Sequence, residues 1–348
     1  MKIMNRTKLI LTRWVISVSM FLLLHPLSGQ EVQKVGTSAA AFLRIPVGAR
    51  AIGMGSAFTA VADDGSAMFW NPGNIANFQK STLFVHHSPW LSELDHTYMS
   101  TSFNLSGLGT VGVNVVSLRT SEMDVTTLEA PMGTGETFTA SSIAAGLTFA
   151  RKLTDRFSIG VNAKYIQERI FNSTASGMAF DIGTLFITPF KDVRFGMAVS
   201  NVGTRMKMNG EDLNAYVDVA PNQKGNNDEI VSQLKTDAFD LPILLQLGLA
   251  WDWHPARDTR MTFACDGVNP NDNGPSVNVG CELALLNESV FMQVGFNELF
   301  LEDREKGLTM GAGIQLPSVG GSELAFSYAY QNFQYLSAVN HFSIEIMF

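Results

Sequence analysis

The side chains that could carry catalysis in this 348-residue chain are few and poorly matched. Serine-type hydrolysis needs a hydroxyl, a histidine and an orienting third group within hydrogen-bond reach. His341 shares one predicted strand face with Ser343 and Glu345, but residues two apart along a strand are separated by about 7 Å. We therefore predict a protein without enzymatic activity and without catalytic residues. Beyond residue 30 the histidines are His86, His87, His96, His254 and His341, and none has an obvious serine partner on a neighbouring strand.

Metal-binding patterns are equally weak. His86 and His87 are adjacent, so on a strand their rings would face opposite sides and could not share an ion. His96 lies near acidic residues of the same loop and could form at most a weak surface site. The pair Asp63-Asp64 lacks the alternating oxygen ligands of an EF-hand loop, so a solvated or capping turn is the simpler interpretation. We predict no metal site.

Neither of two further patterns indicates a cofactor. Gly53-Met54-Gly55 resembles the start of a dinucleotide-binding loop, but Phe58 stands where the third glycine belongs and no crossover helix follows. Cys265 and Cys281 fall on the apolar face of neighbouring predicted strands. A cross-strand disulfide is one interpretation, and two lipid-facing thiols is the simpler one. We predict no cofactor-binding residues.

The elements that position these residues are strands. From Ser81 onward, stretches of about ten residues alternate apolar with small or polar side chains, which gives each strand one apolar and one polar face. In the last stretch Phe342 and Ile344 face one way, while His341 and Ser343 face the other. The expected strands are 81–88, 96–106, 109–118, 141–152, 156–168, 176–187, 191–201, 240–253, 258–268, 275–286, 289–298, 307–316, 321–331 and 338–348.

The connections between these strands are alternately short and long. The longest are 119–140 and 202–239. Bacterial outer-membrane barrels have short periplasmic turns and longer outer loops. The sequence therefore predicts an all-β, transmembrane barrel of about 14 antiparallel strands in the outer membrane, in contact with its lipid, rather than a soluble β-sandwich.

The first thirty residues read as a secretory signal peptide. A basic start precedes the apolar run 14–24, and cleavage after Gly29 or after Gln30 fits equally well. Without this leader, 20 basic residues would face 32 acidic ones, a net charge of −12, which argues against a nucleic-acid partner. We expect three parts: the leader 1–30, a plug-like segment 31–80, and the barrel 81–348.

Residues 36–78 do not follow the barrel rhythm. They are small, glycine-rich and mildly apolar, a composition that suits a segment packed in or against a barrel, where backbones approach closely. Small residues on the lumenal faces, among them Gly160 and Gly280, would make room for such a segment. The ordered phrases in this segment are Gly36-Thr37-Ser38, Val47-Gly48-Ala49-Arg50-Ala51, Gly53-Met54-Gly55-Ser56-Ala57-Phe58, Ala62-Asp63-Asp64 and Trp70-Asn71-Pro72.

With these phrases the chain resembles the PorV/PorQ family of outer-membrane proteins, relatives of the FadL-type fourteen-stranded barrels. The resemblance implies a non-enzymatic barrel that acts in type IX protein secretion in bacteria of the Bacteroidota group. Its implied partners are a large translocon barrel and the C-terminal signal domains of secreted cargo. The alternative is a FadL-like channel for hydrophobic small molecules such as long-chain fatty acids. A bulged strand beside an apolar lumenal pocket would favour the channel, and apolar loop tips around a polar lumen would favour partner binding.

Overall fold

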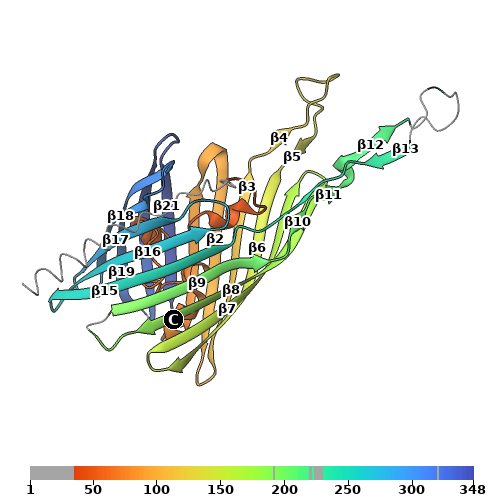
Figure 1. Ribbon diagram of the computed structural model, residues 1–348. Coiled ribbons are helices and arrows are strands. Elements are labelled where there is room, and N and C mark those ends of the chain that lie inside the picture. The colour runs from red at the N-terminus through yellow and green to blue at the C-terminus, as the bar shows by residue number, and fades with distance from the viewer. Residues whose placement is uncertain (1–34, 191–192, 219–221, 223–229, 320) are drawn as a thin grey trace, which may run out of the picture. The chain divides into compact units, whose positions relative to one another are not determined.

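The computed structural model describes residues 35–190, 193–218, 222, 230–319 and 321–348 (Figure 1). The predicted leader 1–30 lies outside the described residues, and its boundary stays a prediction. Fourteen long strands form the wall: β1 (Thr82–Pro89), β2 (Leu94–Leu105), β3 (Gly109–Thr120), β6 (Ala140–Thr154), β7 (Phe157–Ile170), β8 (Ser173–Ile187), β9 (Val193–Gly203), β15 (Leu244–Ala256), β16 (Thr259–Pro270), β17 (Ser276–Leu285), β18 (Val290–Leu299), β19 (Lys306–Val319), β20 (Ser322–Phe333) and β21 (Val339–Met347).

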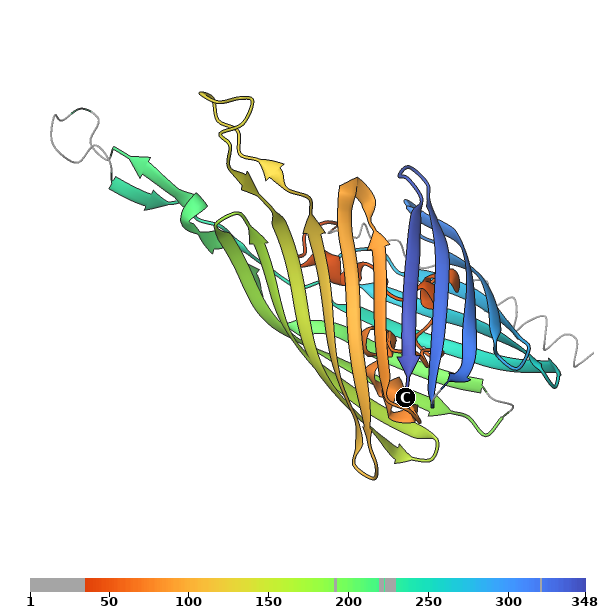
Figure 2. The ribbon, with the colours of Figure 1, turned by 180° about the vertical axis from the view of Figure 1, so that it is seen from behind.

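These strands close into one antiparallel ring. Each pairs with its neighbour along the chain, β9 pairs with both β8 and β15, and the last strand β21 pairs with the first strand β1. Figures 1 and 2 show the ring from opposite sides. The predicted fourteen-stranded barrel is confirmed, and most strand ends differ from the prediction by only a few residues. The largest difference is at β15, which begins at Leu244 rather than at residue 240, since Pro242 has no N–H to donate to a neighbouring strand.

The wall has an apolar outer face and a more polar inner face. Along β21 the side chains of His341, Ser343 and Glu345 are buried inside, while Phe342 and Ile344 are exposed on the outside. The same alternation runs along the other strands, as predicted from the sequence. An exterior of exposed leucine, valine and phenylalanine side chains suits contact with hydrocarbon.

The long loops carry structure of their own. The connection between β3 and β6 pairs β4 (Met123–Asp124) with β5 (Thr137–Phe138). The described part of the long connection 202–239 contains β10 (Met206–Lys207), β11 (Asn209–Gly210), η4 (Glu211–Leu213), β12 (Asn214–Val217), β13 (Ile230–Gln233) and β14 (Ala238–Phe239). These pieces form short antiparallel ladders and so extend the wall beyond the rim.

The core lies inside the barrel. Residues 35–80, here called the N-terminal segment, contain η1 (Ala41–Arg44), α2 (Ala49–Gly53), α3 (Ala67–Trp70) and η2 (Pro72–Asn77), and a further turn η3 (Leu91–Glu93) joins β1 to β2. The red and orange ribbon of this segment lies within the ring in Figures 1 and 2. Its buried apolar side chains form the main clusters with the inner wall. Among the described residues, no helix has the length and hydropathy needed to cross a membrane.

Candidate functional site

The N-terminal segment approaches the inner wall backbone to backbone. A Cβ atom added to Gly196 of β9 would lie 2.5 Å from the Thr59 carbonyl oxygen, and one added to Gly73 would lie 2.6 Å from the Gly183 carbonyl oxygen. Gly160 and Gly280, predicted to make room in the lumen, do so by facing the carbonyl groups of Pro72 and Met54. The prediction that small lumenal residues permit close approach is therefore confirmed.

A buried charge network also ties the segment to the wall. Arg50 of α2 donates from Nε to Oε2 of Glu282 at 2.6 Å and from Nη2 to Oε1 at 2.8 Å, and it also pairs with Asp63. Arg260 and Gln293 of the wall donate to the same Glu282 carboxylate. Burial alone would lower the pKa of Arg50, but Asp63 and Glu282 hold it well above its ordinary value. The guanidinium is therefore a permanent charge at the contact between segment and wall.

The turn at Asp63-Asp64, predicted to be solvated or capping, has one aspartate in each role. Asp63 is exposed, whereas Asp64 is buried and accepts hydrogen bonds from the backbone and hydroxyl of Ser66. Burial raises the pKa of Asp64 above its ordinary value. The adjoining Gly65 N–H donates to the Glu345 carboxylate of β21 at 2.8 Å. This turn therefore anchors the segment to the wall rather than facing only water.

Three of the predicted lumenal or rim histidines meet inside the barrel. His86, His96 and His341 are all fully buried, and the ring centroid of His86 lies 6.0 Å from that of His96 and 5.6 Å from that of His341. The expectation that His96 lies at the surface was wrong, because its side chain takes the inner face of β2. His87 and His254 are exposed. Within the described ranges, no group of three or more His, Cys, Asp or Glu side chains is arranged to hold a metal ion.

The two cysteines are free. Cys265 pairs with Val279 and Cys281 with Phe263, so the thiols are offset by two residues and not opposite each other. Cys265 is exposed on the outer face, which fits the simpler prediction of lipid-facing thiols.

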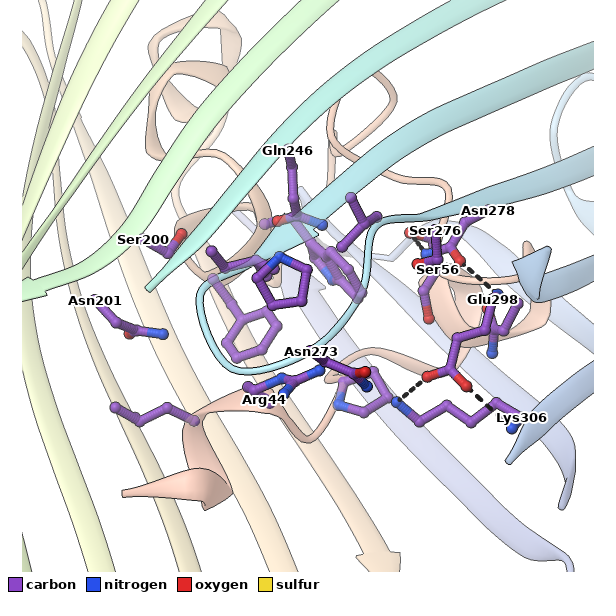
Figure 3. Close-up of a pocket in the computed structure, with 18 of the residues that line it drawn as sticks. Arg44, Ser56, Ser200, Asn201, Gln246, Asn273, Ser276, Asn278, Glu298 and Lys306 are labelled. Carbon is purple, nitrogen blue, oxygen red and sulfur yellow. Dashed lines mark hydrogen bonds and ion pairs between the residues drawn. The ribbon is translucent and has the colours of Figure 1, made fainter. Parts of the chain in front are cut away.

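An outer pocket of about 90 Å³ opens between the N-terminal segment and the wall (Figure 3). It lies where β9, β15, β16, β17, β18 and β19 meet the outer loops, and Phe69 and Trp70 form part of its apolar lining. Figure 3 labels its polar lining, which includes Ser200, Gln246 and Asn278. Sequence reasoning did not find this pocket. The available signal was the break in alternation at Ser200-Asn201 and Asn297-Glu298.

The outer rim exposes large apolar side chains. Leu128 and Met132, in the loop between β4 and β5, are 103% and 94% exposed. Tyr216, Phe300 and Tyr335 on three other outer segments are also largely exposed. These side chains are on four separate outer segments and are available for contact with a partner.

The comparisons with known proteins agree with this architecture. The chain is similar in fold to the CymD monoaromatic hydrocarbon channel, with a TM-score of 0.54, 13% identity, and coverage of 87% of this chain and 97% of that one. For a FadL homologue of Pseudomonas aeruginosa the TM-score is 0.51 and the identity is 11%, and the match covers 87% of this chain and 98% of that one. For the toluene transporter TodX of Pseudomonas putida the TM-score is 0.54 and the identity is 10%, and the match covers 86% of this chain and 96% of that one.

The comparison with curated protein sequences returns no match. The family described as "Type IX secretion system protein PorV" matches residues 28–233, more than half of the chain. Together with the closed barrel, this match identifies the chain as a member of the PorV family and an outer-membrane protein.

Proposed function

We propose that this protein is a non-enzymatic binding component of a type IX secretion system. In this proposal its outer rim docks a large translocon barrel and receives the C-terminal domains of secreted cargo. The family match supports the secretion context, and the rim supports the mode of action. The observation that carries the proposal is the contrast between a filled lumen and an apolar rim.

Because the lumen is filled, a partner can bind only to the outside of the barrel. Residues of the N-terminal segment such as Met54, Phe58 and Met68 are fully buried, and their neighbours include strands from around the ring. The three histidines and Gln331 are fully buried in the lumen as well. A partner therefore meets the outer loops or the lipid-facing wall.

The outer loops have the composition of a docking surface. Leu128 and Met132 project from one loop, and Tyr216 and Val231 project from the β12–β13 ribbon. Tyr216 and Val231 lie directly opposite each other on this ribbon, and exposed apolar side chains that adjoin can serve as an interaction surface. Aromatic residues and methionine are also enriched at protein interfaces. These residues support protein docking at the rim.

The direct experiment is purification of the tagged protein from detergent-solubilised outer membranes, followed by identification of the chains that come with it. We expect recovery of a very large barrel protein. A Leu128→Ser/Met132→Ser variant should recover less of it, since truncating exposed apolar anchors weakens docking. Leu108→Ser, which changes an exposed residue of a short turn at the opposite end, is the matched control.

If the Leu128→Ser/Met132→Ser variant recovered as much partner as the unchanged protein, docking would have to occur elsewhere on the barrel. Recovery of acyl lipids alone, without a partner chain, would favour the channel described next.

The second candidate is a FadL-like channel for hydrophobic small molecules. It is favoured by the fold it shares with proteins named as hydrocarbon and toluene channels, and by a bulge in β9 beside the outer pocket. However, the wall next to this bulge is held by polar contacts. The Asn201 N–H donates to Asp181 at 2.7 Å, and Lys164 pairs with Asp181 at 2.8 Å. The lining of the pocket mixes polar and apolar side chains, and the N-terminal segment fills the lumen beside it, so the observations favour docking.

A further inference from the structure

Two exposed arginines stand close together on the outer face of the wall, at its outer end. The register pairs Arg119 of β3 with Ser141 of β6, and the same Ser141 with Arg169 of β7. Side chains in direct register lie on one face of a sheet, so the two arginines flank a single small serine. Their backbones are two strand spacings apart, about 10 Å, a gap that two arginine side chains can close around one anion.

This pair lies at the outer boundary of the apolar band. On the same face of β6, Ser141 is followed by the exposed Ile143 and Phe149, and Arg151 ends the face at the periplasmic side. Arg151 follows Ser141 by ten residues along the strand. At a rise of about 3.3 Å per residue and a tilt of about 40°, these residues span about 25 Å, the height of the apolar band of a barrel. The two arginines are therefore level with the lipid head groups of the outer leaflet.

Neither guanidinium has an acidic partner. Within the described residues, Arg119 makes no hydrogen bond or ion pair, and Arg169 donates only from Nε, to the Phe171 carbonyl oxygen at 2.9 Å. That bond orients the Arg169 guanidinium and leaves its two terminal nitrogens for another acceptor. Two neighbouring cations without a counterion repel each other, and an anion between them removes this repulsion.

The carboxylates beside the pair have other partners. Glu168 accepts a hydrogen bond from the N-terminal segment inside the barrel, and Asp212 accepts one from the turn between β7 and β8. Asp95 is the cross-strand neighbour of Arg119, but it lies 3.9 Å from the His87 ring and makes no ion pair with Arg119. The positive charge of the pair is therefore available to a ligand.

The surroundings indicate the class of ligand. A guanidinium binds phosphate with two parallel hydrogen bonds, and the Ser141 hydroxyl adds a donor between the two arginines. Directly below the pair, Ile143 and Tyr165 are 42% and 48% exposed and offer apolar surface to hydrocarbon. By contrast, the exposed outward side chains at the outer ends of β16 and β20 are the uncharged Asn269 and Asn332. A phosphate that carries acyl chains matches both halves of the site.

We propose that Arg119 and Arg169 bind the phosphate group of a lipid in the outer leaflet. The Ser141 hydroxyl donates to the same phosphate, and the acyl chains lie along Ile143 and Tyr165. The site fixes a lipid at one side of the barrel, on β3, β6 and β7. This binding goes beyond the secretion role and does not depend on it.

The test is native mass spectrometry of the full-length protein in a neutral detergent. Phosphatidic acid is the probe, phosphatidylcholine with the same acyl chains is the comparison without net charge, and inorganic phosphate represents the head group alone. We expect one phosphatidic acid molecule to bind about tenfold more tightly than phosphatidylcholine, since both guanidiniums pair with its phosphate. Inorganic phosphate should bind more weakly than phosphatidic acid, because it makes no apolar contact.

A pair of double variants separates this site from general attraction to cations. Arg119→Gln/Arg169→Gln should bind phosphatidic acid no more tightly than phosphatidylcholine. Arg151→Gln/Arg156→Gln, which removes two exposed arginines at the periplasmic end, is the matched control and should keep the preference. Because Arg119 and Arg169 have no ion pair in the fold, the first variant should unfold at the same urea concentration as the unchanged protein.

Three results would overturn the proposal. One is equal affinity of the unchanged protein for the two lipids. Another is an equal loss of phosphatidic acid binding in the two double variants. The third is inorganic phosphate that binds as tightly as phosphatidic acid, which would mean that the arginines recognise an anion and not a lipid. None of these results bears on whether a translocon protein copurifies, so the secretion proposal is tested separately.

Discussion

The contact between the N-terminal segment and the wall is held by buried ion pairs and close backbone packing, whereas the outer pocket contains two buried polar side chains that make no hydrogen bond. At the contact, Arg50 meets two carboxylates and the segment's carbonyl groups lie against wall glycines. At the pocket, Ser200 and Asn297 are also buried but have no hydrogen-bond partner among the described residues. The contact has the features of a permanent closure, and the pocket does not.

This difference determines whether a mutation should lower the stability of the barrel. Changes at the contact remove interactions that exist in the folded protein, so they should lower stability. Changes at the pocket remove groups that contribute no hydrogen bond to the fold, so they should leave stability intact. The four predictions below follow this order, from the largest effect on stability to the smallest.

The largest effect is expected for Arg50→Met. It leaves the fully buried Glu282 with only Arg260 and Gln293 as partners, and breaking a buried ion pair typically costs about 3–5 kcal/mol. Urea unfolding in micelles measures the loss. The matched control is Arg205→Met, which breaks an exposed pair with Asp240 on the rim and should leave the unfolding midpoint unchanged. Equal effects of the two variants would contradict a special role for the buried network.

The next effect is expected for Gly295→Ala. Its new methyl group would collide with the backbone of Met54 and Gly55, and overpacking of this kind costs about 1–3 kcal/mol. Gly267→Ala is the control, because the nearest atom to its added Cβ lies 3.9 Å away. Limited proteolysis should cleave residues 35–80 faster in Gly295→Ala alone. A segment equally protected in both variants would show that the glycine contact is not needed.

A smaller and pH-dependent effect is expected for Asp64→Asn. Because burial raises the pKa of Asp64, the folded state holds its proton more tightly than the unfolded state does. The stability that this provides is complete below the ordinary pKa of 3.8 and is lost as the pH rises through the raised value. The variant should therefore gain stability over the unchanged protein as the pH increases. Unfolding midpoints measured from pH 4 to pH 8 would refute this if the difference between the proteins stayed constant.

The smallest effect on stability is expected for Asn297→Leu. Replacing an unsatisfied buried amide by an apolar group of similar size should change the free energy of unfolding by less than about 1 kcal/mol, or increase it. The same urea titration provides the measurement. A loss as large as that of Arg50→Met would mean that Asn297 supports the fold and would remove the contrast between the two regions.

The sequence was enough to predict the barrel and the place of the N-terminal segment. Alternation assigned Phe342 to the outside and His341 to the inside, because the period of two depends on the backbone alone. It could not predict which inner side chains meet. The histidines meet because β1 pairs Ser88 with His96 of the next strand and His86 with Ser343 of β21, and the second of these pairings joins opposite ends of the barrel sequence.

The pocket was missed for a related reason. A bulge shifts the alternation by one residue, and in the sequence this shift looks the same as the end of a strand. The prediction accordingly ended two strands near Asn201 and Glu298, where the structure continues them to Gly203 and Leu299. Only the cross-strand pairing shows that each strand continues through a bulge at these positions.

The most direct test of the closure is conductance across a planar lipid bilayer that contains the purified full-length protein. If residues 35–80 fill the lumen, the unchanged protein should give no steady current, and a variant that lacks residues 36–78 should conduct. A steady current through the unchanged protein, equal to that of the shortened variant, would contradict the account.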